Sequence, residues 1–187
     1  MNEAAIWRFL KSHGMTDAGA AGLMCNLFYE SGLNPKNLQN KYEKILGYSD
    51  ETYTAAVDSG EYTNFVWDKA GYGIAQWTHW SRKQAFLAFC KAAGESVGDR
   101  DAQLKFLMKE LSDSFQGVLD VLMSTVSVRE ASDAVLLQFE KPASKDTKET
   151  KTKRARLGQE YFDKFASIAT EKGDITFEKN TRKKEKS

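Results

Sequence analysis

The chain has 187 residues, and its 41% hydrophobic content is enough to bury one substantial core. No run of 18 or more apolar residues occurs, and the N-terminus, which begins Met-Asn-Glu-Ala, lacks the basic region and apolar stretch of a secretory signal, so we expect no membrane insertion and no signal peptide. The net charge of +1 hides an asymmetry, because residues 141–187 hold 14 Lys and Arg against 8 Asp and Glu. This basic end either rests on an anionic polymer or is a solvated helix face, and no nucleic-acid-binding motif accompanies it, so we expect no nucleic-acid partner.

The first thirty residues predict two helices. Apolar residues recur at helical spacing over residues 3–12, and His13-Gly14 ends that segment. Thr16 or Asp17 can cap a second helix, which Gly32 would end. Glu30 then shares one face of this helix with core leucines.

The middle of the chain is predicted to be less regular. Residues 34–48 are polar, rich in Asn and broken by turns, whereas residues 49–58 predict a short helix. Residues 61–80 are dense in aromatic and β-branched side chains and are interrupted by Gly71 and Gly73. We expect short strands or an extended loop there.

The remaining chain predicts a series of helices. Helical patterns occur at residues 81–94, 99–111, 118–123, 127–139 and 157–168. Ser81 with Gln84 and Ser127 with Glu130 form capping-box patterns at the start of two of them. Pro142 closes the helix that contains residue 139.

These patterns predict a mainly helical protein with a small extended or β portion. We expect one domain over residues 1–170, followed by a basic, flexible tail over residues 171–187. Cys25 and Cys90 each fall in an apolar helical pattern, so we expect free, buried thiols. His13 stands far from the other histidine and from both cysteines, so we expect no metal site and no cofactor.

Glu30 is the strongest candidate for a catalytic residue. It lies in the last turn of its predicted helix, where the negative end of the helix dipole disfavours an ionised carboxyl. The adjoining apolar face adds desolvation, so both effects favour the protonated form that a general acid needs. A Lys or Arg would stabilise this turn better, and the conflict itself points to function. The alternative is a partly exposed glutamate that frays with the helix end.

Three separated motifs carry a resemblance to known proteins. They are NLFYESGLNPKNLQN at residues 26–40, AGYGIAQWTHWSRK at 70–83 and FEKPA at 139–143. A helix that ends in Glu-Ser, followed by an extended Gly-Ile-x-Gln segment, looks like the lysozyme superfamily, which includes goose-type lysozymes and lytic transglycosylases. The full strings closely resemble the phage tail lysozyme family, found in virion tail proteins and some phage lysins, over roughly residues 4–168.

The resemblance implies a lysozyme-like fold, in which a helical lobe and a small extended or β lobe flank the substrate cleft. It implies general acid catalysis by Glu30 on the β-1,4 glycosidic bonds of bacterial peptidoglycan. Gln76 matches the residue that lines the cleft near the reacting sugar, and its amide can donate to and accept from sugar groups. Gln76 could instead only tie its segment to the core. Ser31, Asn34 and Thr78 are further candidates for substrate binding.

The second carboxylate departs from the pattern. Retaining glycosidases hold two carboxyls about 5 to 5.5 Å apart and inverting ones about 6.5 to 9.5 Å apart. Animal-type lysozymes place an aspartate just before Gly-Ile-x-Gln, but this chain has Gly71 there. Asp68 is our candidate partner, and the other acids of the region are Glu43, Asp50, Glu51, Asp58 and Glu61. Without a partner, Glu30 would act alone, and a hydroxyl or acetamido group of the sugar would attack.

Aromatic side chains crowd around the second motif and suit the apolar faces of sugar rings. They are Tyr62, Phe65, Trp67, Tyr72, Trp77 and Trp80. We take Tyr72 and Trp77 as candidates for stacking on substrate. A small domain also needs large aromatics in its core, so we expect about half of the six to be packing residues.

The exact activity stays open between muramidase, glucosaminidase and lytic transglycosylase, because a fold of this type does not decide among them. A catalytically silent module that binds glycan is a further alternative. The expected partners are peptidoglycan glycan strands and other phage tail subunits. The expected location is the virion tail or, after release, the host cell wall.

Overall fold

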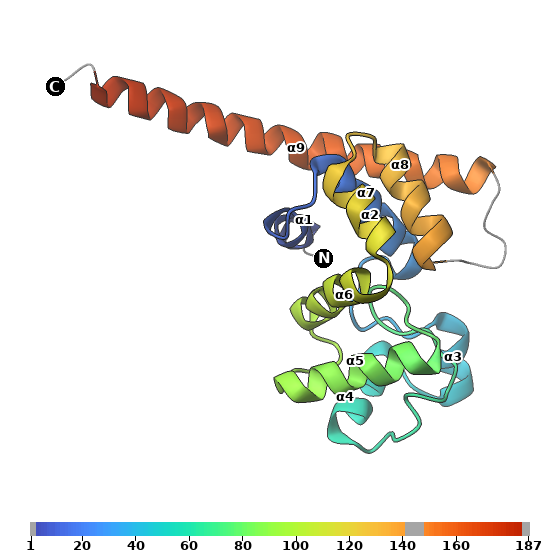
Figure 1. Cartoon of the computed structure of the whole chain (residues 1–187). Helices are drawn as coiled ribbons and strands as arrows, with labels where there is room; N and C mark the ends of the chain where they lie inside the picture. The colour runs from blue at the N-terminus through green and yellow to red at the C-terminus, as the bar shows by residue number, and fades with distance from the viewer. Residues whose placement is uncertain (1–2, 141–147, 185–187) are drawn as a thin grey trace. The chain divides into compact units, whose positions relative to one another are not determined.

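The computed structural model describes residues 3–140 and 148–184, and the side chains among them as far as Ala166. Their backbone is mainly helical, which confirms that part of the predicted fold class (Figure 1). By their internal contacts the residues form two compact units. The first is built mainly from Asn26–Leu119, and the second from Ala4–Cys25 with the chain after Leu119. None of the described helices combines the length and the apolar character needed to cross a lipid bilayer.

Side chains cap the start of three helices of the first unit. The unit holds the end of α2 (Asp17–Ser31), then α3 (Asn40–Leu46), α4 (Asp50–Ser59), α5 (Trp80–Ala93) and α6 (Arg100–Ser114). Ser49 caps α4 in a capping box with Thr52, and the Asp99 carboxylate accepts from the Ala102 N–H at the start of α6. At α5 the cap is His79, not the predicted Ser81. The His79 ring accepts from the Ser81 N–H, so the cap lies two residues earlier than predicted.

Helix α3 lies in the polar, Asn-rich stretch that was described as broken by turns and in which no helix was predicted. It has seven residues, none of them buried, and it ends at Gly47 in the left-handed region at φ 75°. A helix without a buried face leaves no apolar periodicity in the sequence. The pattern that identifies the other helices is therefore missing here.

The aromatic-rich segment over residues 61–80 does not form a β lobe. Within the described chain its pairing is limited to isolated antiparallel bridges, from Leu38 to Tyr72 and from Tyr72 to Trp77, and turns make up most of the rest. Strands favour aromatic and β-branched residues because these fit a half-buried surface. Here the same side chains fill the core of the unit, with Phe65, Tyr72 and Trp77 at most 1% exposed. The prediction of strands was wrong for this reason, and of the two alternatives only the extended loop is left.

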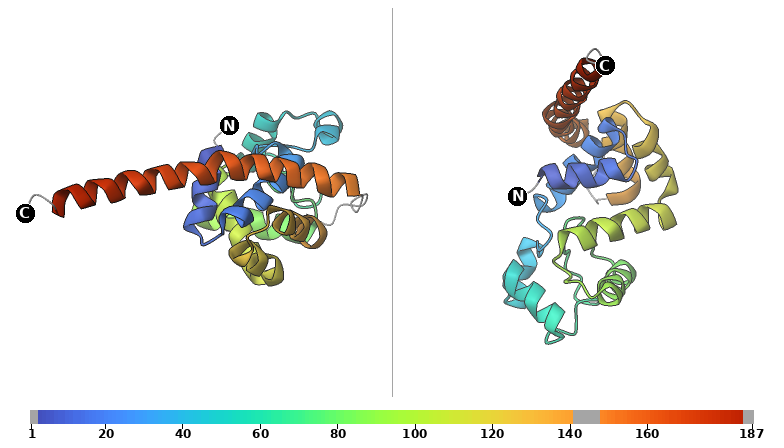
Figure 2. Two further views of the ribbon diagram at one scale, coloured as in Figure 1. Left: turned by 90° about the horizontal axis from the view of Figure 1, so that it is seen from above. Right: turned by 90° about the vertical axis from the view of Figure 1, so that its left-hand side faces the viewer.

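The described part of the second unit consists of helices joined by short turns. It holds α1 (Glu3–Ser12), most of α2, α7 (Gln116–Ser124), α8 (Val128–Ala134) with the π-helical turn η1 (Val135–Glu140), and α9 (Lys148–Lys184). Helix α9 packs along α8 and then extends as one long helix (Figure 2). Pro142, predicted to close the helix before it, lies outside the described residues. The flexible tail over residues 171–187 stays a prediction.

Glycines allow close helix packing in the second unit. A Cβ atom added to Gly22 of α2 would lie 2.4 Å from the Ala131 Cβ of α8. One added to Gly158 of α9 would lie 2.7 Å from the Val128 side chain. Both distances are too short for a real contact, so these helices touch where no side chain intervenes.

Candidate active site

Glu30 lies where it was predicted, in the last turn of α2, and its side chain is half-buried. The helix ends at Gly32, which adopts φ 63° and donates its N–H to the Phe28 carbonyl at 2.7 Å. Leu33 follows with φ 60° and is buried. Two successive residues in the left-handed region turn the chain sharply away from the helix. This turn leaves Glu30 at a helix end instead of within a continuing helix.

Ser31 joins the two sequence motifs. Its hydroxyl lies 2.8 Å from the Ile74 carbonyl and 3.1 Å from the Leu27 carbonyl, and its side chain is buried. The end of α2 is thereby fixed against the Gly-Ile-x-Gln segment, 43 residues later in the chain. The contact gives Ser31 a positioning role, and its burial argues against the predicted contact with substrate.

Gln76 is held by its amide nitrogen. The nitrogen donates toward the Asn37 Oδ1 at 2.8 Å, the Asn37 carbonyl at 3.0 Å and the Gly73 carbonyl at 3.1 Å. Gln76 has φ 49°, and a Cβ atom added to Gly71 would lie only 2.7 Å from its Oε1. The place where animal-type lysozymes carry an aspartate is therefore closed to a side chain by Gln76 itself.

Gln103 of α6 fixes the same segment and was not singled out from the sequence. It is fully buried, and its Oε1 accepts from the Ile74 N–H at 2.8 Å. Its amide nitrogen donates to the carbonyls of Pro35 and Val97 at 2.5 and 2.7 Å. The signal in the sequence was a glutamine four residues before Leu107, on the apolar side of this helix, where a buried amide needs partners.

Asp68 is the centre of a buried polar cluster. Its side chain and that of Lys83 are both 0% exposed, and Lys83 Nζ lies 2.6 Å from Asp68 Oδ1. The other oxygen accepts from the hydroxyls of Tyr53 at 2.5 Å and Tyr62 at 3.2 Å. The Ala70 N–H donates to Oδ1 at 2.9 Å. The carboxylate thus has four donors inside the protein.

This cluster shifts the pKa of its neighbours. Burial lowers the pKa of the Lys83 ammonium, although its hydrogen bond to Asp68 offsets part of that effect. Burial, together with the hydrogen bond to Asp68, raises the pKa of Tyr53. Burial and the Asp68 charge raise the pKa of Tyr62 to about 12. A carboxylate so enclosed is a structural anchor, which argues against Asp68 as the second catalytic carboxyl.

Two of the other candidate acids also have internal partners. Asp50 accepts from the Leu38 N–H at 2.7 Å and from the Asn34 amide at 2.8 Å, so the side chain of Asn34 is engaged as well. Asp58 accepts from the Ser96 hydroxyl and the Val97 N–H. Glu51 and Glu61 are exposed and Glu43 is half-buried.

The aromatics predicted to stack on sugars are core residues. Tyr72 and Trp77 are both 0% exposed. The Trp77 ring stacks on Phe86 with 4.7 Å between centroids, and its N–H donates to Glu110 at 3.0 Å. This burial is incompatible with stacking on substrate, so that prediction was wrong. Of the residues at this end of the motif, Thr78 is exposed, and its hydroxyl donates to the Gln76 carbonyl.

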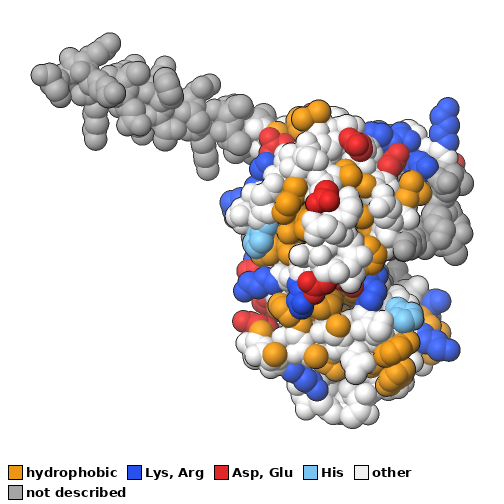
Figure 3. All heavy atoms as spheres, in the orientation of Figure 1, with side chains coloured by type: hydrophobic (Ala, Val, Ile, Leu, Met, Phe, Trp, Pro, Cys, Tyr) orange, Lys and Arg blue, Asp and Glu red, His pale blue; other side chains and the backbone are white. Residues whose placement is uncertain are grey.

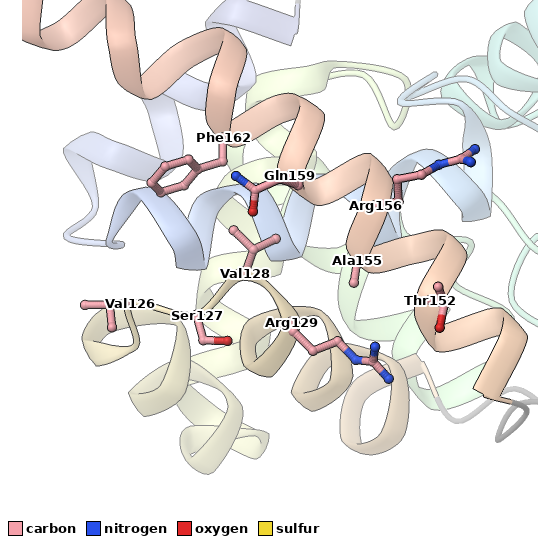
Figure 4. A pocket seen from close by; sticks show the side chains of 9 residues that line it. All are labelled: Val126, Ser127, Val128, Arg129, Thr152, Ala155, Arg156, Gln159 and Phe162. Carbon is pink, nitrogen blue, oxygen red and sulfur yellow. The ribbon is translucent and has the colours of Figure 1, made fainter.

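A separate groove of about 660 Å³ lies in the second unit, between the start of α8 and α9 (Figure 4). It is lined by Val126, Ser127, Val128, Arg129, Thr152, Ala155, Arg156, Gln159 and Phe162. The lining includes no carboxylate and none of the predicted site residues. We therefore place the candidate active site in the first unit, at the end of α2. Among the side chains that the structure describes, no three His, Cys, Asp or Glu residues cluster to hold a metal ion.

Comparison with known protein families gives a match over most of the chain. Residues 1–165 match the phage tail lysozyme family. The match covers most of the chain and contains both the end of α2 and the Gly-Ile-x-Gln segment that Ser31 ties to it. The chain belongs to the phage tail lysozyme family and is a lysozyme-like hydrolase of bacterial cell wall.

Proposed function

We propose that the protein cleaves β-1,4 glycosidic bonds in the glycan strands of peptidoglycan, with Glu30 as the general acid. The observation that carries the proposal is the hydrogen bond from Ser31 to the Ile74 carbonyl at 2.8 Å. It fixes the residue next to Glu30 against the Gly-Ile-x-Gln segment. A carboxyl held on a rigid frame can be aimed at a scissile bond, whereas a frayed helix end cannot.

In the proposed reaction, the Glu30 carboxyl donates its proton to the glycosidic oxygen as the bond to the anomeric carbon breaks. Positive charge develops on the sugar ring, and the resulting Glu30 carboxylate stabilises it. The carboxylate then takes a proton from the group that attacks the anomeric carbon. The carboxyl thus ends the cycle protonated again.

We further propose that Asp68 takes no part in this proton transfer. Its four internal donors come from Lys83, Tyr53, Tyr62 and the Ala70 N–H, and its side chain is 0% exposed. To face a sugar it would have to leave a buried counter-charge, which costs about 3–5 kcal/mol. If a second carboxyl positions the attacking water, it comes from the acids that lack this enclosure, Glu43, Glu51 and Glu61.

Replacement of Glu30 by Gln tests the proposal. Glu30→Gln keeps the size and removes the proton donor, so the rate of cell-wall clearing should fall by a factor of about 10² to 10⁴. Glu43→Gln, Glu51→Gln and Glu61→Gln test the three candidates for the second carboxyl, and the one that also loses activity identifies it. Equal clearing by wild type and Glu30→Gln would contradict catalysis by Glu30. No clearing by either, with binding retained, would indicate a silent glycan-binding module.

The enclosure of Asp68 favours one second candidate, a lytic transglycosylase. With a single carboxyl, the hydroxyl on C6 of the same sugar can replace water as the attacking group and close a 1,6-anhydro ring. The product then lacks a reducing end and one water in mass. Mass spectrometry of digested cell wall separates the cases, because a muramidase or a glucosaminidase leaves a reducing N-acetylmuramic acid or N-acetylglucosamine respectively.

The family also suggests where the protein acts. We propose that it reaches the host cell wall as part of a virion tail, with other tail subunits as partners, or as a released lysin. Antibody labelling of purified virions would distinguish the two, since only a tail component stays bound to the particle.

A further inference from the structure

Two tryptophans form an exposed pair in the first unit. Trp67 is 59% exposed and Trp80 is 46% exposed, and their rings stack with 5.1 Å between centroids and 18° between planes. The chain has four tryptophans, and the other two, Trp7 and Trp77, are 6% and 0% exposed. The exposed pair therefore lies outside the core, and adjacent exposed apolar side chains, unlike single ones, point to a binding surface.

The buried ion pair holds these two rings together. Trp67 directly precedes Asp68, and Trp80 is the first residue of α5, three residues before Lys83. The contact between Lys83 and Asp68 at 2.6 Å fixes the loop that carries Trp67 against the helix that carries Trp80. A platform held in this way loses little conformational freedom when a ligand binds.

The surroundings of the pair suit a sugar. Thr78 and His79 directly precede Trp80, Lys69 lies two residues after Trp67, and all three are exposed. Figure 3 shows hydrophobic side chains at the surface directly beside a histidine. A pyranose ring has an apolar face of C–H groups, which packs on flat aromatic rings, and polar substituents at its edge, which need hydrogen-bond partners. An aromatic pair with a polar rim offers both.

We propose that Trp67 and Trp80 form a glycan-binding platform, on which a pyranose ring of the glycan strand stacks. The proposal rests on the proposed function for the identity of the glycan. Trp80 lies two residues beyond the Gly71–Thr78 segment, so a strand that passes along this segment can continue onto the pair. The platform binds the strand away from the reacting bond and contributes affinity, while Glu30 carries out the proton transfer.

Binding can be measured without turnover in the Glu30→Gln background. The probe is soluble, peptide-free glycan of alternating N-acetylglucosamine and N-acetylmuramic acid, and the readout is its dissociation constant by calorimetry. Trp67→Ala and Trp80→Ala should each weaken binding about tenfold, the effect of one lost ring contact of roughly 1.4 kcal/mol. Ile45→Ala, at a side chain that is 67% exposed in the same unit, is the matched control and should change binding by less than about twofold. Tryptophan variants that bind as tightly as this control would overturn the platform.

A second measurement needs no tryptophan substitution. N-bromosuccinimide oxidises exposed indoles, and peptide mass spectrometry locates the oxidised residues. The glycan should protect Trp67 and Trp80, while Trp7 and Trp77 resist oxidation with or without it as internal controls. Oxidation of Trp67 and Trp80 at the same rate with saturating glycan as without it would refute the proposal. Protection that depends on protein concentration alone would also refute it, because it would indicate that a second copy of the chain covers the pair. Because neither assay requires cleavage, an inactive protein that still binds through the pair would refute only the proposed function.

Discussion

Replacement of Lys83 by Met tests the buried ion pair most directly. Met has about the volume of the lysine stem but removes the charge that lies 2.6 Å from Asp68. Both side chains are 0% exposed, so water cannot replace the lost partner. Removing one member of such a pair costs about 3–5 kcal/mol. For a chain of this size the loss corresponds to a melting temperature lower by about 6–20 °C.

The assay is urea unfolding followed by circular dichroism, at low salt and at 1 M NaCl. The loss of unfolding free energy should be the same at both salt concentrations, because salt ions screen a buried ion pair very little. Lys91→Met is the matched control, since Lys91 is exposed on the same helix, and it should cost less than about 1 kcal/mol. The double variant Asp68→Asn/Lys83→Met removes both charges and should recover at least half of the loss. Its activity per folded molecule should stay within about tenfold of wild type, whereas a catalytic Asp68 predicts a loss of about 10² to 10⁴. If Lys83→Met costs no more than Lys91→Met, the buried cluster is not the anchor inferred above.

Three further outcomes are expected from urea unfolding. Gly22→Ala should destabilise the protein by about 1–3 kcal/mol, because the new Cβ would lie 2.4 Å from the Ala131 Cβ. Alanine favours helices more than glycine does, so a gain in stability would contradict the close packing. Gly73→Ala should cost about 1–3 kcal/mol, because φ is 78° and the new Cβ would lie 2.8 Å from the Gln103 amide; a neutral result shows that this segment is free to move. Burial raises the pKa of the Cys90 thiol from 9.0 to about 12. The stability that the protonated thiol contributes is therefore complete below pH 9 and is lost as the pH rises toward 12. The stability difference between wild type and Cys90→Ala should therefore narrow over that range, and a constant difference would speak against the shift.

Local signals in the sequence were sufficient for most of the helices. The second helix was expected from Thr16 or Asp17 to Gly32, and α2 spans Asp17–Ser31. The apolar period that marks such a helix reflects the face it buries, and its caps satisfy the free backbone groups at its ends. Helix α3 buries no residue and escaped prediction for that reason.

The sequence was less informative about which side chains meet across the unit. The sequence showed the aromatic cluster and indicated that about half of its side chains would be packing residues. The two residues chosen from it as accessible to substrate were the wrong ones. Tyr72 and Trp77 are buried, whereas Trp67 and Trp80 are exposed. In a regular strand successive residues face opposite sides of the sheet, so position predicts burial. In a segment of turns no fixed period links position in the sequence to burial. The partner of Asp68 is a lysine 15 residues later, and no local pattern predicts such a pairing.

The surroundings of Gln76 indicate how the segment can contact a sugar. Three acceptor oxygens, two on Asn37 and one on Gly73, surround the amide nitrogen of Gln76. They identify that position as the nitrogen and the other as the oxygen. Both N–H groups of Gln76 are then used within the protein. Its Oε1 lies close to Gly71, where a side chain would displace it. Gln76 can therefore serve the substrate only as an acceptor, toward a sugar hydroxyl or an acetamido N–H. In this proposal the segment next to Glu30 positions the glycan through a neutral oxygen and adds no charge to that of the Glu30 carboxylate, which stabilises the positive charge that develops on the sugar.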